Sequence, residues 1–189
     1  MSYLYNVKGI ILAMNPLLRF MLIAGSLYLV WLFGYEHYLA IDGRLDAALT
    51  QNIAMAGAAV LRLVGFDAVV SPEQANLILL SNTPAVKVGY YCDGLVLYAL
   101  FTGFVLAFPG PIRYKLWFIP MGLILIYSIN ILRVAALCLN HIYWHQTVDF
   151  NHHFTFTFIV YGFIFLLWIW WATRLAPRVP INSAPHVHA

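Results

Sequence analysis

The sequence predicts an all-α integral membrane protein with about four main transmembrane helices, an amphipathic helix and a small extracytoplasmic β-hairpin. Of the 189 residues, 63% are hydrophobic and 9% are charged, whereas a water-soluble domain normally has about 25% charged residues. Several apolar runs reach the length of about 17–25 residues that a helix needs to cross a bilayer. A stretch with β-branched residues and turn signals separates the first of these runs from the others.

Charge and cysteine content exclude several classes of function. The formal net charge is only +3, and the ten basic residues are scattered along the chain. This pattern does not indicate a nucleic-acid-binding surface or a polybasic membrane anchor. Two cysteines, Cys92 and Cys138, are too few for a disulfide framework and lack the CxxC spacing of a thiol redox centre. Cys92 is therefore a candidate nucleophile, whereas we interpret Cys138 as a packing residue.

We interpret residues 1–189 as one membrane domain that begins with a short cytoplasmic lead, residues 1–16. The apolar run 17–39 is long enough for one span of about 20 residues. Arg19 lies at the front of this run and Glu36 near its end. Because basic residues are enriched on the cytoplasmic side of membrane spans, we place the N-terminus inside.

Residues 41–91 are predicted to lie outside the bilayer or at its surface. Within 45–65, Asp46, Gln51 and Arg62 interrupt apolar residues at helical spacing. This pattern favours an amphipathic helix at the interface, or packed on the bundle, over an isolated span.

A β-hairpin is predicted to follow this helix. Two β-prone runs, 76–80 and 85–91, flank the turn signal Ser81-Asn82-Thr83-Pro84. Open strands cannot lie in lipid, where each unpaired backbone group costs several kcal/mol. We therefore expect the hairpin on the extracytoplasmic side.

Residues 92–174 are predicted to form the catalytic core spans, followed by a cytoplasmic tail, residues 175–189. Arg113 and Lys115 make the loop after the first of these spans basic, so this loop is assigned to the cytoplasm. With the first span, this gives four spans and places both termini inside. The three apolar runs of the core cover residues 92–109, 117–140 and 154–173.

Three ionisable groups fall at one depth in this topology. Cys92 opens a helix, whose positive N-terminal end is expected to favour the thiolate. Arg133 lies sixteen residues after Trp117, about 24 Å along a helix that needs about 30 Å to cross the bilayer, and so in the outer leaflet. The pair His152/His153 precedes the last span at the same boundary. At about 100° per residue, one face of the helix over 117–140 and its continuation carries Asn130, Arg133, Asn140 and His141, and Cys138 points away from Arg133.

Three motifs follow one another in this half of the chain: Val-x-Val-x-x-x-Cys92-x-Gly94, Asn130-x-x-Arg133-Val134 and Phe150-Asn151-His152. In this order the chain resembles the exosortase/archaeosortase family of membrane cysteine transpeptidases over roughly residues 85–174. The resemblance implies that Cys92 is the nucleophile, Arg133 the oxyanion-stabilising or substrate-orienting cation, and His152 the proton-transfer partner. Asn130, Asn151 and His153 are supporting candidates, and the adjacent His153 leaves the choice of histidine open.

The resemblance implies a protease or transpeptidase of the cytoplasmic (inner) membrane with its active site on the extracytoplasmic face. Its partners would be membrane-anchored proteins with a C-terminal sorting signal, which it would cleave through a thioester and transfer to an acceptor. The mechanism requires no metal or organic cofactor, and no nucleic-acid partner is expected. Many family members have Cys-Ser-Gly where this chain has Cys92-Asp93-Gly94, and bacterial exosortases commonly have about twice as many spans, so the chain resembles a short form.

The histidines support a different interpretation. His141 and His145 are four residues apart, so both can face one ligand, and His152 and His153 follow a short loop. A zinc, copper or haem site on the outer face would make the chain a membrane metal- or haem-binding protein. A third interpretation is a small non-catalytic subunit or transporter element, in which Arg133 is an assembly or gating charge.

Overall fold

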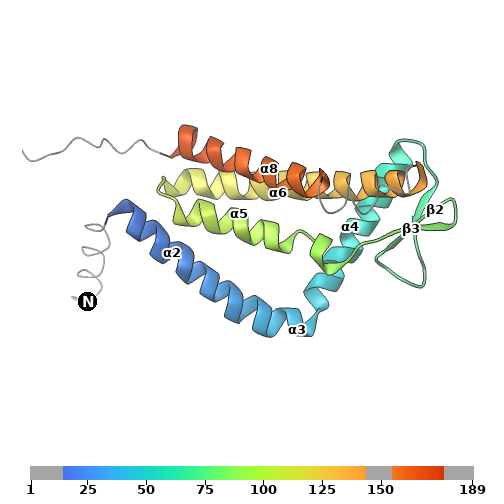
Figure 1. Cartoon of the computed structure of the whole chain (residues 1–189), viewed down its shortest axis with the longest axis horizontal. Coiled ribbons are helices and arrows are strands. Elements are labelled where there is room, and N and C mark those ends of the chain that lie inside the picture. The colour runs from blue at the N-terminus through green and yellow to red at the C-terminus, as the bar shows by residue number, and fades with distance from the viewer. Residues whose placement is uncertain (1–14, 144–154, 177–189) are drawn as a thin grey trace, which may run out of the picture.

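The computed structural model describes residues 15–143 and 155–176, and the fold is reported for these ranges (Figure 1). Three described helical segments are long and apolar enough to cross a membrane, and a fourth apolar helix is shorter. The all-α membrane class with a small sheet is thereby confirmed. The three long segments are Leu17–Asp42, Ile112–Tyr143 and Phe156–Leu175, and the shorter helix is Leu95–Ala107.

The first long segment is one continuous helix made of α2 (Pro16–Trp31), η1 (Leu32–Leu39) and α3 (Ala40–Asp42). The Asn15 side chain caps its start by accepting a hydrogen bond from the Leu17 N–H, at 3.0 Å. Gly43 ends it with a left-handed backbone, φ 65°, which glycine adopts without the steric penalty of a side chain. The chain then turns directly into α4.

Helix α4 (Arg44–Leu63) is amphipathic, as its spacing predicts. Gln51 and Asn52 are exposed, whereas the opposite face packs on helix α6 and on the sheet. The helix is not among the segments apolar enough to cross a membrane by itself. Its buried face consists of Asp46, Thr50, Ile53, Ala54, Gly57, Ala58 and Leu61.

The predicted hairpin is present as β2 (Leu77–Leu80) and β3 (Thr83–Lys87). Ser81 and Asn82 form its turn with positive φ angles of 49° and 63°, values typical of a two-residue hairpin loop. A further strand, β1 (Ala68–Val70), pairs antiparallel with β2 and extends the hairpin to a sheet of order β1-β2-β3. The sequence pattern did not predict this short strand.

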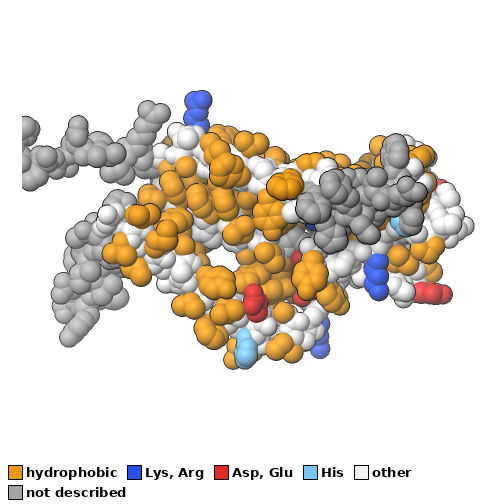
Figure 2. All heavy atoms as spheres, viewed as in Figure 1, with side chains coloured by type: hydrophobic (Ala, Val, Ile, Leu, Met, Phe, Trp, Pro, Cys, Tyr) orange, Lys and Arg blue, Asp and Glu red, His pale blue; other side chains and the backbone are white. Residues whose placement is uncertain are grey.

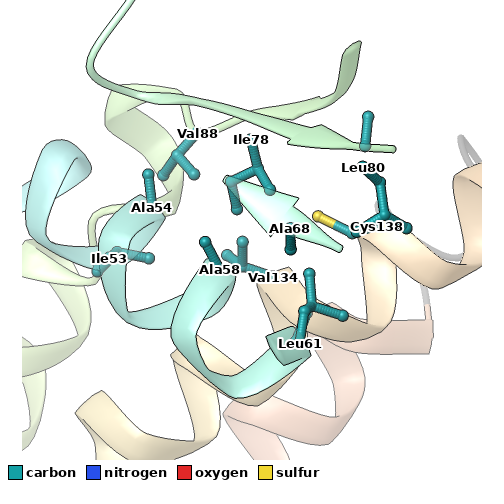
Figure 3. Close-up of a cluster of buried hydrophobic side chains, with 12 residues drawn as sticks. Ile53, Ala54, Ala58, Leu61, Ala68, Ile78, Leu80, Val88, Val134 and Cys138 are labelled. Carbon is teal, nitrogen blue, oxygen red and sulfur yellow. The ribbon is translucent and has the colours of Figure 1, made fainter. Parts of the chain in front are cut away.

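The sheet packs with α4 and α6 around a set of buried residues that we call the sheet-side cluster (Figure 3). The side chains of Ile78 and Val88 point from the sheet side toward α4. The members of the cluster are Ile53, Ala54, Ala58, Leu61, Ala68, Ile78, Leu80, Ala85, Val88, Val134, Ala135 and Cys138.

Helices α5 (Leu95–Ala107), α6 (Ile112–Tyr143) and α8 (Phe156–Trp170, continued by η5, Trp171–Leu175) run side by side (Figure 1). With 13 residues, α5 is shorter than the lower limit of about 17 for a span. The second group of buried residues lies between these helices, and we call it the bundle cluster. Its members are Leu97, Phe101, Val105, Phe118, Ile126, Val160, Ile164, Leu167 and Trp171.

Helix α2 touches the bundle at one end and diverges from it toward α3 (Figure 1). Phe20 makes edge contacts with the rings of Phe104 and Phe108, at centroid distances of 5.9 and 6.3 Å. Beyond this contact an apolar groove of about 700 Å³ opens between α2, η1 and α5, and the surface is visibly hollowed there (Figure 2). Leu95 and Val96, at the start of α5, line one part of the groove.

Candidate active site

Cys92 lies at the end of a short 3-10 turn, η2 (Tyr90–Cys92), which joins the sheet to α5. Its side chain is half-buried and packs against the sheet-side cluster. The Asn130 side-chain amide, on α6, donates a hydrogen bond to the Cys92 carbonyl oxygen at 2.8 Å. Asn130 is completely buried, so this bond fixes the cysteine turn against α6.

The start of α5 differs from the expectation that Cys92 opens the helix. The helix begins at Leu95, and Asp93 Oδ1 accepts the hydrogen bond of the Leu95 N–H at 2.8 Å. A side-chain oxygen that accepts from a free N–H in the first turn is a common helix cap. The carboxylate of Asp93, rather than the cysteine sulfur, therefore meets the positive end of this helix.

Gly94 is required by both conformation and space. Its φ angle of 81° lies in the left-handed region, which side chains disfavour. A Cβ atom at this position would also lie 3.0 Å from the Tyr98 hydroxyl oxygen and 3.3 Å from Asn130 Nδ2. The close approach of Asn130 to the Cys92 turn thus depends on the glycine.

Arg133 lies three residues after Asn130, so it is on the same face of α6 and about 4.5 Å further along the axis. Its side chain is half-buried, and Nε is buried without a hydrogen-bond partner among residues 15–143 and 155–176. An unfilled donor of this kind is unusual, because buried polar groups are normally hydrogen-bonded. Asn130 and Arg133 thus place an anchoring amide and a cation one turn apart on α6.

Two acids that the sequence reading did not assign to the site lie behind the cysteine turn. Asp93 and Asp46 are only 2% and 4% exposed, and the negative charge of Asp46 raises the pKa of the Asp93 carboxyl. Asp46 Oδ1 also accepts a hydrogen bond from the Tyr35 hydroxyl at 2.7 Å. The sequence reading treated Asp46 only as a polar interruption of an amphipathic helix. The sequence signal that could have identified Asp46 is its spacing: it lies four residues before Thr50, on the face of α4 that is buried.

Asp93 precedes the apolar helix α5, and its surroundings raise the pKa of its carboxyl. Burial, together with the hydrogen bond and negative charge of Asp46, raises the pKa of the Asp93 carboxyl to about 6, although the Leu95 N–H acts in the opposite direction. Removal from water disfavours the charged form of a carboxyl group, and a neighbouring carboxylate does the same.

The histidine assignment falls mostly outside the described residues. His145, Asn151, His152 and His153 all lie there, so the choice between His152 and His153 stays a prediction. His141 is described and half-buried near the end of α6. Within the described ranges, no group of three or more His, Cys, Asp or Glu is arranged to hold a metal ion. The metal- or haem-binding alternative therefore also stays a prediction.

Cys138 and the polar face of α6 occupy the positions that helical periodicity predicts. Cys138 is completely buried in the sheet-side cluster. Asn130 and Asn140 are buried, whereas Arg133 and His141 are partly exposed. The polar face of α6 is therefore turned toward the interior of the protein.

Comparison with known proteins gives one match. A protein-family model described as "Transmembrane exosortase" matches residues 7–171, which is most of the chain. No curated protein and no solved structure matches.

Proposed function

We propose that this chain, which belongs to the transmembrane exosortase family, is a membrane-embedded cysteine protease or transpeptidase that cleaves a C-terminal sorting signal of exported proteins. We place its active site on the extracytoplasmic face of the cytoplasmic membrane. Family membership supports a multi-pass membrane enzyme that acts on proteins with sorting signals. The observation that carries the cysteine mechanism is the Asn130–Cys92 hydrogen bond, because it holds the cysteine turn one helical turn from Arg133.

In the first half of the reaction, the Cys92 thiolate attacks the carbonyl carbon of the scissile peptide bond. A carbon–sulfur bond forms, and the carbonyl oxygen becomes an oxyanion, which the Arg133 guanidinium stabilises. The carbon–nitrogen bond then breaks as His152 protonates the leaving amine. The products are an acyl thioester on Cys92 and the released C-terminal segment.

In the second half, an amine, a hydroxyl group or water attacks the thioester carbon. His152 takes the proton from the attacking group, a second oxyanion forms beside Arg133, and the carbon–sulfur bond breaks to restore the thiolate. Transfer to an amine or a hydroxyl group is transpeptidation or esterification, and transfer to water is proteolysis.

We assign the apolar C-terminal helix of the substrate to the groove between α2 and α5. The groove is continuous with the site, because Leu95 and Val96 line it and follow Cys92 by only three and four residues. Tyr35, whose hydroxyl bonds Asp46, lines it as well. An apolar helix in this position would bring the polar residues that precede it next to Cys92.

Intact-mass spectrometry of cysteine variants tests the nucleophile. Wild-type protein, Cys92→Ala and the matched control Cys138→Ala are each coexpressed with tagged proteins that end in a polar motif, a hydrophobic helix and a basic tail. We expect a thioester adduct or a shortened substrate with wild type and with Cys138→Ala, and neither with Cys92→Ala. Unchanged processing by Cys92→Ala would remove Cys92 from the mechanism.

A pair of glycine variants tests the groove. Gly103 lines it, and a Cβ at Gly103 would meet no atom within 4 Å, so the side chain of Gly103→Leu starts in open space and projects into the groove. Gly162 on α8 is equally open but does not line the groove, so Gly162→Leu is the control. We expect slower cleavage with Gly103→Leu alone. Equal rates for the two variants would place the substrate helix elsewhere.

A further inference from the structure

The strand that leads to Cys92 has a free outer edge. The sheet order is β1-β2-β3, so β3 pairs on one side only, with β2, and no other described strand lies along its outer edge. After β3 the chain stays extended through Gly89, whose φ and ψ angles are −86° and 167°, and then enters the cysteine turn (Figure 1). The outer edge of β3 therefore runs directly to the proposed nucleophile.

The pairing of β3 with β2 fixes which of its backbone groups face outward. The Val88 N–H donates to the Asn76 carbonyl oxygen at 2.8 Å, and the Val88 carbonyl oxygen accepts from the Asn76 side chain at 2.9 Å. Leu77, the partner of Lys87, instead directs its carbonyl oxygen to the β1 side, where it accepts a backbone N–H at 2.8 Å. Because backbone groups alternate in direction along an antiparallel strand, the N–H and C=O of Lys87 and the N–H of Gly89 point away from β2.

These outward groups have the spacing of a parallel ladder. Lys87 and Gly89 are exposed, and none of the three groups has a hydrogen-bond partner within residues 15–143 and 155–176. In a parallel pair, one residue of the added strand donates to the C=O before its neighbour and accepts from the N–H after it. The Lys87 C=O and the Gly89 N–H are such groups, one on each side of Val88. With the Lys87 N–H as a further donor, the edge can hold an extended segment by its backbone alone.

The proposed reaction requires an extended substrate segment beside Cys92. A peptide bond inside an α-helix has its carbonyl oxygen bonded to the N–H four residues further on. An extended segment is open to nucleophilic attack, but its N–H and C=O groups need partners when they leave water, since unpaired groups are costly. A segment that adds to a sheet edge finds these partners in the backbone of the neighbouring strand.

We propose that the polar segment of the substrate, just before its apolar helix, binds as an added strand parallel to β3, along Lys87 and Gly89. The direction is parallel because β3 and the cysteine turn precede α5 as the polar segment precedes the apolar helix, which we place beside α5 in the groove. The Gly89 C=O already accepts from the Cys92 N–H at 2.9 Å, so the edge ends just before the nucleophile. The scissile bond then follows the paired residues. This inference rests on the proposed function, which supplies the occupant and its direction.

N-methylated peptides test the added strand. The probe is a synthetic peptide with the polar segment and apolar helix of a protein that wild type shortens in coexpression. Its binding to Cys92→Ala in detergent is measured by fluorescence anisotropy, with one backbone nitrogen methylated at a time. Because alternate residues of a strand face the edge, we expect about tenfold weaker binding at every second position of the polar segment and little change between them. Equal effects at all positions, or none, would overturn the added strand.

Proline variants test the edge of β3. Lys87→Pro removes an outward N–H without removing a bond to β2, and an edge strand tolerates proline at such a position. Val70→Pro is the control on the other edge strand, β1, because the next N–H, that of Ser71, bonds β2 and the Val70 N–H points outward. We expect about tenfold weaker binding of the unmethylated peptide with Lys87→Pro alone. Equal binding by the two variants would overturn the proposal, and if Lys87→Pro does not fold, the methylation pattern decides.

The added strand and the proposed function fail in different ways. If Cys92→Ala still shortens the coexpressed protein, the cysteine mechanism fails, and an alternating methylation pattern still supports the added strand. If cleavage requires Cys92 but the pattern is absent, the function stands and the added strand fails. If wild type shortens no protein, both fail.

Discussion

The sheet-side cluster and the bundle cluster differ in the size of their side chains. Five of the twelve residues of the sheet-side cluster are alanine and none is aromatic. The bundle cluster has no alanine and includes Phe101, Phe118 and Trp171. Small side chains fill the space between α4, α6 and the sheet, whereas aromatic rings fill much of the space between the bundle helices.

The surroundings of the two clusters differ as well, and this changes what burial contributes to stability. We place the sheet-side cluster outside the hydrocarbon, because an open sheet edge cannot face lipid. There, burial removes apolar surface from water. Around α5, α6 and α8 the alternative surroundings are lipid tails, which are as apolar as leucine, so only packing favours association. Cys92, the proposed nucleophile, packs against the sheet-side cluster.

A swap of cations on α6 should give the largest difference between the two regions. Arg133→Lys should lose about a hundredfold in turnover, because an ammonium lacks the planar fork of donors that fits an oxyanion. The control Lys115→Arg is at the bundle end, where Lys115 donates to the carbonyl oxygens of Leu106 and Phe108. Cleavage assays should show little change for this variant, and near-normal turnover in Arg133→Lys would remove Arg133 from catalysis.

A matched pair of isoleucines compares the stability of the two clusters. Ile78 and Ile126 are both completely buried, one in each cluster. Ile78→Ala should lower the free energy of unfolding by about 3 kcal/mol, since transfer and cavity costs add. Ile126→Ala should cost less, because its unfolded helix remains in detergent or lipid. Denaturation in detergent followed by tryptophan fluorescence measures both, and equal losses would contradict the difference in surroundings.

Two glycines should show the smallest effects, with opposite outcomes. A Cβ at Gly122 would overlap the buried ring of Phe101, so Gly122→Ala should destabilise the protein by about 1–3 kcal/mol. A Cβ at Gly57 would lie 3.4 Å from Ile78 Cδ1 and from Val134 Cγ1, an ordinary contact. Gly57→Ala should be neutral or slightly stabilising, because alanine favours a helix by up to about 1 kcal/mol over glycine. Thermal denaturation of both variants in detergent distinguishes these outcomes.

Helical periodicity and turn residues predicted most of the fold. The amphipathic helix expected over 45–65 is α4, and the hairpin expected around Ser81–Pro84 is β2–β3. Strand β1 could not be predicted in this way, because three residues carry no periodic signal and the strand exists through its pairing with β2. The start of α5 was predicted at Cys92, because the apolar run reaches the length of a span only when it is counted from there. The helix begins at Leu95.

The site was predictable only where a residue type is unusual in its setting. Arg133, a charge within an apolar run, is such a residue, and so is Cys92 at the start of one. The influence of Asp46 on the pKa of Asp93 links residues 47 positions apart, and no local pattern encodes it. The bond from Asn130 to Cys92 likewise arises from packing, because its acceptor is a backbone carbonyl that any residue would supply.

The length of α6 links the depth of the site to the thickness of the bilayer. A helix of 32 residues is about 48 Å long, whereas the hydrocarbon core is about 30 Å thick. Arg113 and Lys115 belong to the cytoplasmic side, so Trp117 marks that edge of the hydrocarbon, and Arg133 follows Trp117 by 16 positions, or roughly 24 Å of helix. Arg133 then lies about 6 Å inside the other edge. Lengthening the acyl chains by a few carbons would bury this guanidinium deeper in lipid, and shortening them would bring it to water. The thickness of the host membrane therefore sets how much lipid or water surrounds Arg133.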